Sequence, residues 1–393
     1  MALAACAQPL PASVTLRGHG WGHGRGMSQW GALGYAVDHG WSTGQILDHY
    51  YGGTSTQPLG SNPEQRVFLR SREARDLVVA HERGQLAVRV DGTLLSGQYQ
   101  AVRIHRISSG FFELFVGAGC DGPWSSWRTA HASEIDLRST AIDDVPANLL
   151  QLCSEDGTRA YRGRLAAVEA RNTIETVNVV RTESLLRSVI AREVSASWAD
   201  LGDGRGAAAV RAQAVAARSY AGAGDGRWGT FATTCDDTSC QVYSGVSFRP
   251  TGGALVTYED RRTDQAVVDT AGQVRKWSDG RVASTEFSSS SGGWTAGGAF
   301  PAVVDEGDDV ARNPNHDWTV VLPAAAVETA FDRRQGRDVG ALEGIDVVHR
   351  NGLGADGGRV LAVTVRFTGT DVTLTGSELR SVLQLRSDWF VMT

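Results

Sequence analysis

The sequence predicts an α+β protein in which a mixed, β-rich region is followed by a helical core. Between residues 65 and 180, apolar and polar residues alternate in short runs, and Gly- and Asp-containing turns separate several of these runs. Residues 184–198 and 207–221 instead carry apolar or small residues at helical spacing. The change from a period of two to a helical period supports this fold class and excludes an all-helical or all-β chain.

The bulk composition excludes several classes of protein. Hydrophobic residues make up 41% of the 393 residues and charged residues 21%, which is typical of a globular chain. The formal net charge of −6 gives no positive field for nucleic acid or an anionic membrane, so we expect neither as a partner. Since no run of eighteen apolar residues occurs, we expect no transmembrane segment, and since no heptad pattern occurs, we expect a monomer.

The first thirteen residues are expected to be flexible and to hold the remnant of an export signal. The run "LAAC" ends at Cys6 and resembles the end of a bacterial lipoprotein signal, whose cysteine would be lipidated. The charged and apolar parts of a full signal are missing, so a cleaved signal and a functionless Ala-rich terminus stay as alternatives. We expect an extracellular or cell-wall location, with Cys6 as a possible lipid anchor.

Three further regions follow in order. Residues 14–64 begin with a short strand, continue as the glycine-rich stretch "GHGWGHGRGMSQWGA", and end with two short helices, of which Ser28 can cap the first. Residues 65–170 form the β-rich domain. Residues 171–393 form the helical core, in which the alanines of 207–221 let neighbouring backbones approach closely.

The five cysteines favour an oxidising compartment. None forms a CxxC pair or lies beside a His at zinc-finger spacing, so a structural zinc module has little support. Two bridges, Cys120 to Cys153 and Cys235 to Cys240, use four of the cysteines and leave Cys6 over.

One helical window places a carboxylate where an apolar residue is expected. Leu186, Val189 and Ile190 occupy positions i, i+3 and i+4 of a stripe, and the next position of that stripe is Glu193. An acid on an inward-facing stripe needs either a structural partner or a chemical role.

Several phrases together resemble the SpoIID/LytB family of bacterial wall proteins. They are "LLRSVIAREVSASW", "AVRAQAVAARSYA", "DDTSCQVYSG", "FSSSSGGWT", "NPNHDWTVVL", "GSELRSVLQLRSDWF" and "GHGWGHGRGMSQWGA". In the family the last of these phrases usually follows the "LRSxWF" phrase, whereas here it opens the chain. This order is similar to a circular permutation and predicts that residues 14–51 pack beside residues 385–393.

The resemblance implies a protein directed at peptidoglycan and, in the sporulation branch of the family, a lytic transglycosylase. Such an enzyme cuts the bond between N-acetylmuramic acid and N-acetylglucosamine and leaves a 1,6-anhydro sugar. The family's catalytic acid corresponds to Glu193 in "EVSASW", where Ser195 replaces the family's proline. A relative carries zinc near this region, but only Cys235 and Cys240 resemble its ligands, so we expect a disulfide and no metal or cofactor, with zinc as the alternative.

Glu193 suits this chemistry because the leaving oxygen must receive a proton at neutral pH. Burial among apolar side chains would raise the pKa of Glu193 and keep it protonated. A transglycosylase needs only this one acid, since the 6-hydroxyl of the muramic acid attacks and the ionised Glu then accepts its proton. A hydrolase would need a second carboxylate, for which Asp236, Asp237 and Glu286 are candidates.

Other polar residues are candidates for binding the glycan in a groove of the helical core. Arg218 can hold a sugar carboxylate or instead form an internal salt bridge, and the serine and glycine run at 288–293 is expected to form a flexible polar edge. The interleaved glycines argue for a loop at His19 and His23 and against a metal site. The complete set of binding candidates is Gln213, Arg218, Tyr220, Tyr243, Ser289, Ser290, Gly292, His19, His23, Ser28 and Gln29.

Three functions compete at this point. The sequence favours an exported lytic transglycosylase that acts on peptidoglycan glycan strands through Glu193. The alternative is a non-catalytic wall-binding enhancer that activates a wall amidase, and a glycan hydrolase is the third. A pure binding protein has no need of an acid on an apolar stripe, which favours the enzyme.

Overall fold

The computed structural model describes residues 10–142, 145–224 and 226–393, which form two compact units. The first unit combines the chain up to Gly53 with Glu286–Thr393, and the second is Thr54–Thr285. The predicted boundaries differ from this division: the β-rich region and the helices that follow it share one unit, whereas the chain after Thr285 joins the N-terminal segment. Cys6 lies outside the described residues.

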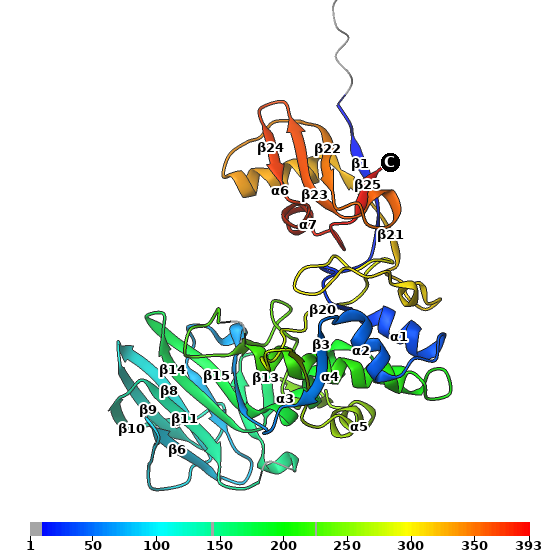
Figure 1. Cartoon of the computed structure of the whole chain (residues 1–393). Helices are drawn as coiled ribbons and strands as arrows, with labels where there is room; N and C mark the ends of the chain where they lie inside the picture. The colour runs from blue at the N-terminus through cyan, green and yellow to red at the C-terminus, as the bar shows by residue number, and fades with distance from the viewer. Residues whose placement is uncertain (1–9, 143–144, 225) are drawn as a thin grey trace, which may run out of the picture. The chain divides into compact units, whose positions relative to one another are not determined.

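The second unit contains two large sheets whose strands are nearly all antiparallel neighbours (Figure 1). The predicted alternation over residues 65–180 is confirmed as strands. The seven-stranded sheet has the order β16 (Thr234–Cys235), β4 (Glu64–Phe68), β15 (Thr173–Arg181), β14 (Arg164–Ala170), β11 (Glu134–Ser139), β6 (Leu86–Val90) and β7 (Thr93–Leu94). The eight-stranded sheet has the order β10 (Trp124–His131), β9 (Phe111–Gly117), β8 (Ala101–Ser108), β5 (Leu77–Ala80), β12 (Leu150–Ser154), β13 (Gly157–Tyr161), β17 (Ser247–Pro250) and β18 (Val256–Thr257).

Both predicted disulfides are present in this unit. Cys120 is bonded to Cys153, and Cys235 is bonded to Cys240. The first bridge ties the loop before β10 to β12, and the second closes a short loop directly after β16.

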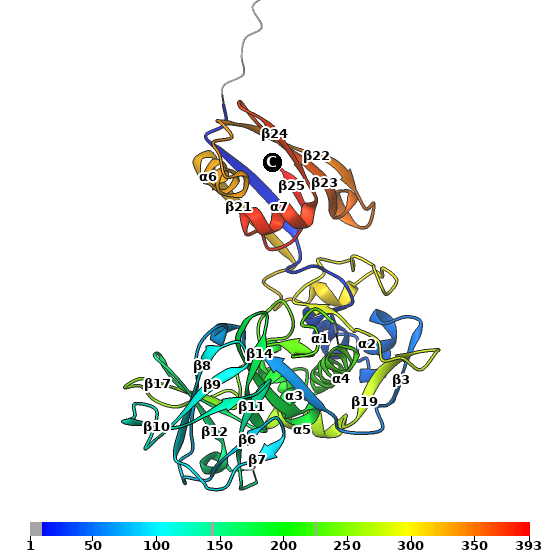
Figure 2. The same cartoon turned by 90° about the vertical axis from the view of Figure 1, so that its left-hand side faces the viewer.

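Three helices of the second unit gather next to the sheets (Figure 2). They are α3 (Thr182–Glu193), α4 (Ala207–Ala223) and α5 (Arg261–Asp269), and α4 also contacts the 3₁₀ helix η3 (Ala196–Asp200) and β19 (Gln273–Trp277). The buried alanines of α4, at positions 209, 212, 214, 216 and 217, permit this close packing on several sides. β19 pairs in turn with β3 (Thr54–Pro58).

In the first unit, β1 (Ser13–His19) lies between β21 (Asp317–Pro323) and β25 (Phe390–Met392). The pairing of Leu16 with Met392 and the mark of the C-terminus beside β1 in Figure 1 show the N-terminal segment next to the C-terminal one. The expected proximity of residues 14–51 and 385–393 is therefore observed. Circular permutation of the family order stays a prediction.

The rest of the first unit surrounds this three-stranded sheet and the glycine-rich stretch. A hydrophobic cluster joins β1 and β21 to a second three-stranded sheet and two helices, with Phe331, Phe367 and Phe390 buried in it. Ser28 caps the first helix as predicted, since its hydroxyl accepts a hydrogen bond from the Gly31 N–H. The elements are β2 (Met27–Ser28), α1 (Gln29–Val37), α2 (Thr43–Tyr50), β20 (Phe287–Ser288), η4 (Glu306–Asp309), α6 (Ala324–Gln335), β22 (Leu342–Arg350), β23 (Val360–Phe367), β24 (Asp371–Leu374) and α7 (Gly376–Leu383).

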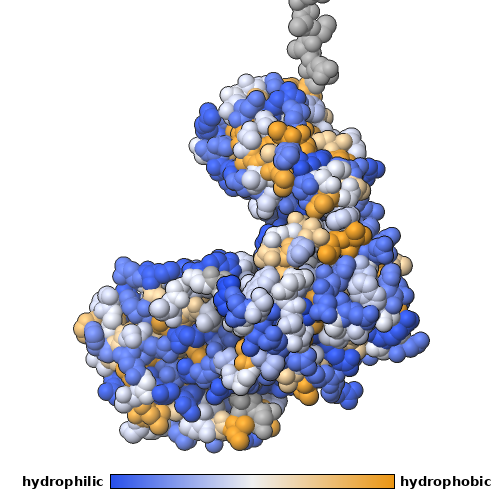
Figure 3. Space-filling model, in the orientation of Figure 1, coloured by the Kyte–Doolittle hydropathy of each residue, from blue (hydrophilic) through white to orange (hydrophobic). Residues whose placement is uncertain are grey.

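The visible face is largely hydrophilic, with hydrophobic residues in scattered patches (Figure 3). Within the described parts of the chain, none of the helices has both the length and the apolar character required to cross a bilayer.

Candidate functional site

Glu193 is the last residue of α3. The predicted helix over 184–198 ends here because Val194 adopts an extended conformation while its N–H still donates to the Ile190 carbonyl. Leu186, Val189 and Ile190 are fully buried, as the stripe predicts, whereas the side chain of Glu193 is only half-buried. The acid therefore lies where the apolar face of α3 reaches the edge of the helical core.

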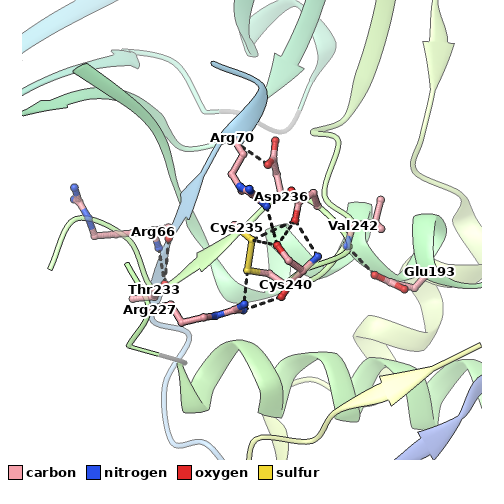
Figure 4. The surroundings of a disulfide bond; sticks show 11 residues. Arg66, Arg70, Glu193, Arg227, Thr233, Cys235, Asp236, Cys240 and Val242 are labelled. Carbon is pink, nitrogen blue, oxygen red and sulfur yellow. Dashed lines mark hydrogen bonds and ion pairs between the residues drawn. A yellow bond between two sulfur atoms is a disulfide. The ribbon is translucent and has the colours of Figure 1, made fainter. Parts of the chain in front are cut away.

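A backbone amide holds the carboxyl group in place. The Val242 N–H donates to Oε1 of Glu193 at 2.7 Å (Figure 4). Val242 follows the loop closed by Cys235 and Cys240, and a hydrogen bond from the Tyr243 N–H to the Asp236 carbonyl closes the same loop at its base. The disulfide loop thus fixes the position of the amide that contacts Glu193.

Replacing both Cys235 and Cys240 by serine should lower the free energy of unfolding by about 2 kcal/mol, because the bridge closes a loop of only five residues. The Val242 amide should also exchange its hydrogen faster. Chemical denaturation and hydrogen–deuterium exchange measure the two effects. The matched control is the double serine variant of Cys120 and Cys153, which should lose more stability, about 4 kcal/mol, without faster exchange at Val242. Equal exchange at Val242 in all proteins would contradict the positioning role of the loop.

The same disulfide loop carries two carboxylates in different environments. Burial raises the pKa of Asp236 to about 6, although the Arg70 N–H donates to its Oδ1 at 3.0 Å. Burial would also raise the pKa of Asp237, but hydrogen bonds from Ser239 and the nearby Arg70 charge hold it below its usual value. Asp236 can therefore hold a proton near neutral pH, whereas Asp237 is an ion-paired loop residue.

The raised pKa of Asp236 predicts a pH dependence of stability. Between about pH 4 and pH 6 the unfolded carboxyl ionises while the folded one keeps its proton, so this group's contribution to stability falls as the pH rises. Relative to the parent, Asp236→Asn should gain on the order of 2 kcal/mol across this window. Denaturation curves at pH 4, 5 and 6 measure the difference. Asp237 has a lowered pKa and is ionised in both states through most of this window, so the difference between Asp237→Asn and the parent should stay nearly constant. An equal pH response of the two variants would refute the assignment.

Two buried amides lie next to this region. The Nε2 group of Gln241 donates to the Ala217 carbonyl of α4 at 3.0 Å, and Gln213 lies one turn before Ala217. Within the part of the chain that the structure describes, both amide atoms of Gln213 and Oε1 of Gln241 have no hydrogen-bond partner, although both residues are almost fully buried. Buried amides of this kind are usually satisfied by water or by a ligand. Gln213 thus stays a binding candidate.

Arg218 forms an internal salt bridge, which was the alternative to its binding a sugar carboxylate. Its side chain is fully buried, and it forms a bidentate pair with Glu183 of α3 at 2.9 and 2.8 Å. The guanidinium also donates to the backbone carbonyls of Ala214, Val267 and Gln273. With its donors used inside the unit, Arg218 cannot reach a glycan.

The two tyrosine candidates differ from each other. Tyr243 is buried, its ring packs against Tyr161, and its hydroxyl donates to Asn178 at 2.7 Å, so it is a core residue and cannot stack on a sugar. Tyr220 is half-buried near the C-terminal end of α4. Only Tyr220 is placed where a ligand can touch it.

The serine and glycine run belongs to the first unit and is not a flexible edge. Ser290, Ser291 and Gly292 are buried, and Asp308 accepts hydrogen bonds from the Ser290 hydroxyl and from the backbone amides of Ser291 and Gly292. Ser289 is half-buried, and its hydroxyl accepts a hydrogen bond from Asn315. These residues position the backbone of the first unit, which corrects the binding role predicted for Ser290 and Gly292.

Asp308 is the centre of a buried polar network that the sequence reasoning missed. It also accepts hydrogen bonds from Ser28 at 2.6 Å and from His316 at 3.0 Å. Burial and the charge of Asp308 raise the pKa of the neighbouring Asp305 to about 7. The only signal in the sequence was the acidic run "DEGDD", which by itself reads as a surface loop. Ser28 is therefore both a helix cap and a buried partner of Asp308, and Gln29 is buried beside it.

The remaining candidates also lie in the first unit. Nδ1 of His19 lies 2.6 Å from Asp317, whereas Nδ1 of His23 accepts a hydrogen bond from the Arg25 N–H. Glu286 forms a bidentate pair with Arg25, which lowers its pKa and makes it an ion-paired carboxylate and not a free acid. Within the described ranges, no group of three or more His, Cys, Asp or Glu residues could hold a metal ion.

The bonded cysteines also bear on the zinc alternative. Because Cys235 and Cys240 are joined to each other, neither offers a thiolate ligand in this form. Zinc binding at this pair would require the reduced protein.

Comparison with known proteins links the second unit to one family. The family model described as "Stage II sporulation protein" (SpoIID) matches residues 170–277. The amidase enhancer of Bacillus subtilis (strain 168) is 30% identical over 150 residues, which are 37% of this chain and 18% of the relative, so the match spans less than a fifth of that protein's length. No solved structure matches the chain. The matched residues 170–277, which contain Glu193, α4 and the Cys235–Cys240 loop, are similar to the SpoIID family.

Proposed function

We propose that this protein is an exported bacterial lytic transglycosylase that cleaves the glycan strands of peptidoglycan, with Glu193 as its single acid and base. Glu193 would protonate the oxygen between N-acetylmuramic acid and N-acetylglucosamine. The 6-hydroxyl of the muramic acid would then attack the anomeric carbon, and the ionised Glu193 would accept the hydroxyl proton. The products are a 1,6-anhydro-muramyl end and a free 4-hydroxyl, and no water is consumed.

The observation that carries the proposal is the position of Glu193. It ends a buried apolar stripe at the edge of the helical core, and the Val242 N–H donates to its Oε1 at 2.7 Å. Other carboxylates of the second unit, such as Glu183 and Glu169, form bidentate pairs with arginines. A hydrogen bond from a backbone amide fixes the orientation of the carboxyl group at the place where the apolar face of α3 reaches the edge of the core. The unsatisfied amide of Gln213 is the second support, because it can bind an acetamido group or a hydroxyl of the sugar.

The experiment is mass spectrometry of the products from the purified protein, incubated with intact and with peptide-stripped glycan strands. Anhydro-muramyl ends would support the transglycosylase. Products that carry an added water would indicate a hydrolase, which needs a second carboxyl group. Asp236, which lies in the Cys235–Cys240 loop and has a raised pKa, is the first candidate to test for that role. The comparison of the two substrates shows whether stem peptides must be removed first.

A second candidate is the enhancer class, which the name of the Bacillus subtilis relative favours. In this role the protein would bind wall glycan and activate a wall amidase without cutting the glycan. Arg218 is buried and paired with Glu183, so it gives no support to a substrate site and does not favour the enzyme over the enhancer. Binding to glycan strands without any cleavage, together with faster turnover by an added amidase, would favour this candidate.

A further inference from the structure

The glycine-rich stretch of the first unit presents an aromatic ring on a rigid loop. Trp21 is 45% exposed, and its backbone is held by two hydrogen bonds with Ser290, at 2.9 and 3.1 Å. The guanidinium of Arg386 lies over the Trp21 ring, 5.2 Å from its centroid. An exposed indole on a fixed backbone loses little conformational entropy when a sugar ring stacks on it.

Three more arginines lie around the same loop. Arg25 pairs with Glu286, and Arg359 pairs with Asp388. Arg359 is almost fully buried against Gly24, where a Cβ atom would collide with its guanidinium, which explains the glycine at this position. Nε of Arg359 has no hydrogen-bond partner among the described residues.

Arg380 and Arg386 are the members of this group that form no ion pair with a carboxylate of the described residues. Nε of Arg380 donates to the Arg386 carbonyl, which also accepts a hydrogen bond from the Gly22 N–H, so Arg380 is tied to the loop. Within the described residues no acid pairs with Arg380, although it is only partly exposed. Burial and the charges of Arg359 and Arg25 lower its pKa, against the opposing charge of Asp388.

The charge balance of this loop surface is positive. Glu286 pairs with Arg25 and Asp388 pairs with Arg359, whereas among the described residues Arg380 and Arg386 have no carboxylate in an ion pair with them. His23 adds no charge, since burial and Arg25 lower its pKa to about 4, and its Nδ1 is already an acceptor, which places the proton of the neutral ring on Nε2 as a further donor. Like charges held together in this way are stabilised when an anion binds among them.

We propose that Trp21, Arg380 and Arg386 form a binding site for a sugar that carries a carboxylate, with the pyranose ring on Trp21 and the carboxylate between the two guanidinium groups. A muramic acid residue has this chemistry, because its lactyl group places a carboxylate beside the ring. The site lies in the first unit, outside residues 170–277, and the proposal does not depend on cleavage by Glu193.

The test is equilibrium binding of two fluorescent oligosaccharides of equal length to the full chain, in a Glu193→Gln background that prevents cleavage. One is a peptide-stripped glycan of alternating N-acetylmuramic acid and N-acetylglucosamine, and the other is a chitooligosaccharide, which lacks the carboxylates. Arg380→Gln should weaken binding of the glycan about tenfold and leave chitooligosaccharide binding unchanged. Trp21→Ala should weaken both. Arg366→Gln, which removes an exposed arginine of β23 paired with Asp346, is the charge-matched control and should weaken neither.

Arg386→Gln provides the same test should Arg380→Gln fail to fold, which circular dichroism would show. The proposal is overturned when Arg380→Gln affects both oligosaccharides equally or neither of them. It is also overturned when a poly(glycerol phosphate) chain binds more tightly than the glycan and depends on Arg380, since the site would then recognise phosphate and not a carboxylated sugar.

Discussion

Replacing Glu193 by glutamine is expected to reduce the release of anhydro-muramyl products by about 10²–10⁴-fold, the range that general acid–base catalysis by one side chain contributes. Glutamine has nearly the same shape, and its Oε1 can still accept the Val242 N–H, so the end of α3 should keep its conformation. What the variant loses is the proton for the leaving oxygen. Product release is followed by mass spectrometry over time, and the free energy of unfolding is measured in parallel.

The matched control for this variant is Glu169→Gln. Glu169 belongs to the same unit but pairs with Arg106 at the end of β14, so its loss should leave cleavage unchanged. Full cleavage by Glu193→Gln would refute the assignment of the acid. If Asp236→Asn were then inactive, the proton donor would be the buried carboxyl of the disulfide loop.

The largest effect on stability is expected for Arg218→Met, which should lower the free energy of unfolding of the second unit by about 3 kcal/mol or more. Methionine fills a similar volume but leaves Glu183 without its bidentate partner and removes the guanidinium hydrogen bonds to the carbonyls of Ala214, Val267 and Gln273. Urea denaturation followed by circular dichroism measures the change. Affinity for glycan strands should stay unchanged under conditions in which the variant is folded.

Two further variants make this result specific. Arg211→Met removes an arginine of the same helix that pairs with Asp269 at the surface, and it should change stability little. The double variant Glu183→Gln/Arg218→Met should lose less than the two single variants together, because the unpaired charge is removed as well. A stable Arg218→Met protein with weakened glycan binding would instead restore the substrate role.

The strands and helices were predictable because their patterns are local. The alternation of apolar and polar residues over 65–180 indicates which side of each strand faces a core. The small residues of 207–221 indicate that other elements pack closely around one helix. Ser28 at a helix start needs only a neighbouring N–H to act as a cap, and the structure confirms that cap. The end of α3 was misplaced by five residues, since the extended conformation of Val194 has no signal in the apolar stripe.

The candidate site was predictable only in part. Glu193 was selected as a candidate because a charged residue interrupted a local period, and its role stays a prediction. The two disulfides, which the cysteine count suggested, are present. Arg218 and Tyr243 were ligand-binding candidates because each is an isolated polar residue in an apolar segment. The sequence pattern of such a residue is the same whether its partner is a sugar or another part of the chain. In the structure those partners are Glu183 and Asn178.

The sequence alone was sufficient to predict the mixed α+β class, the similarity of residues 170–277 to one family, the cysteine pairs and the place of Glu193 at the end of an apolar stripe. Each of these depends on residues that are close together in the sequence or on a shared motif. The tertiary structure alone decided which polar side chains are satisfied internally. The contact between Ser28 and Asp308 joins residues 280 positions apart, and the pairing of Arg218 with Glu183 depends on how α3 packs on α4. The arginines around Trp21 likewise come together only through folding, because burial and hydrogen bonding are set by distance in space and not by distance along the chain.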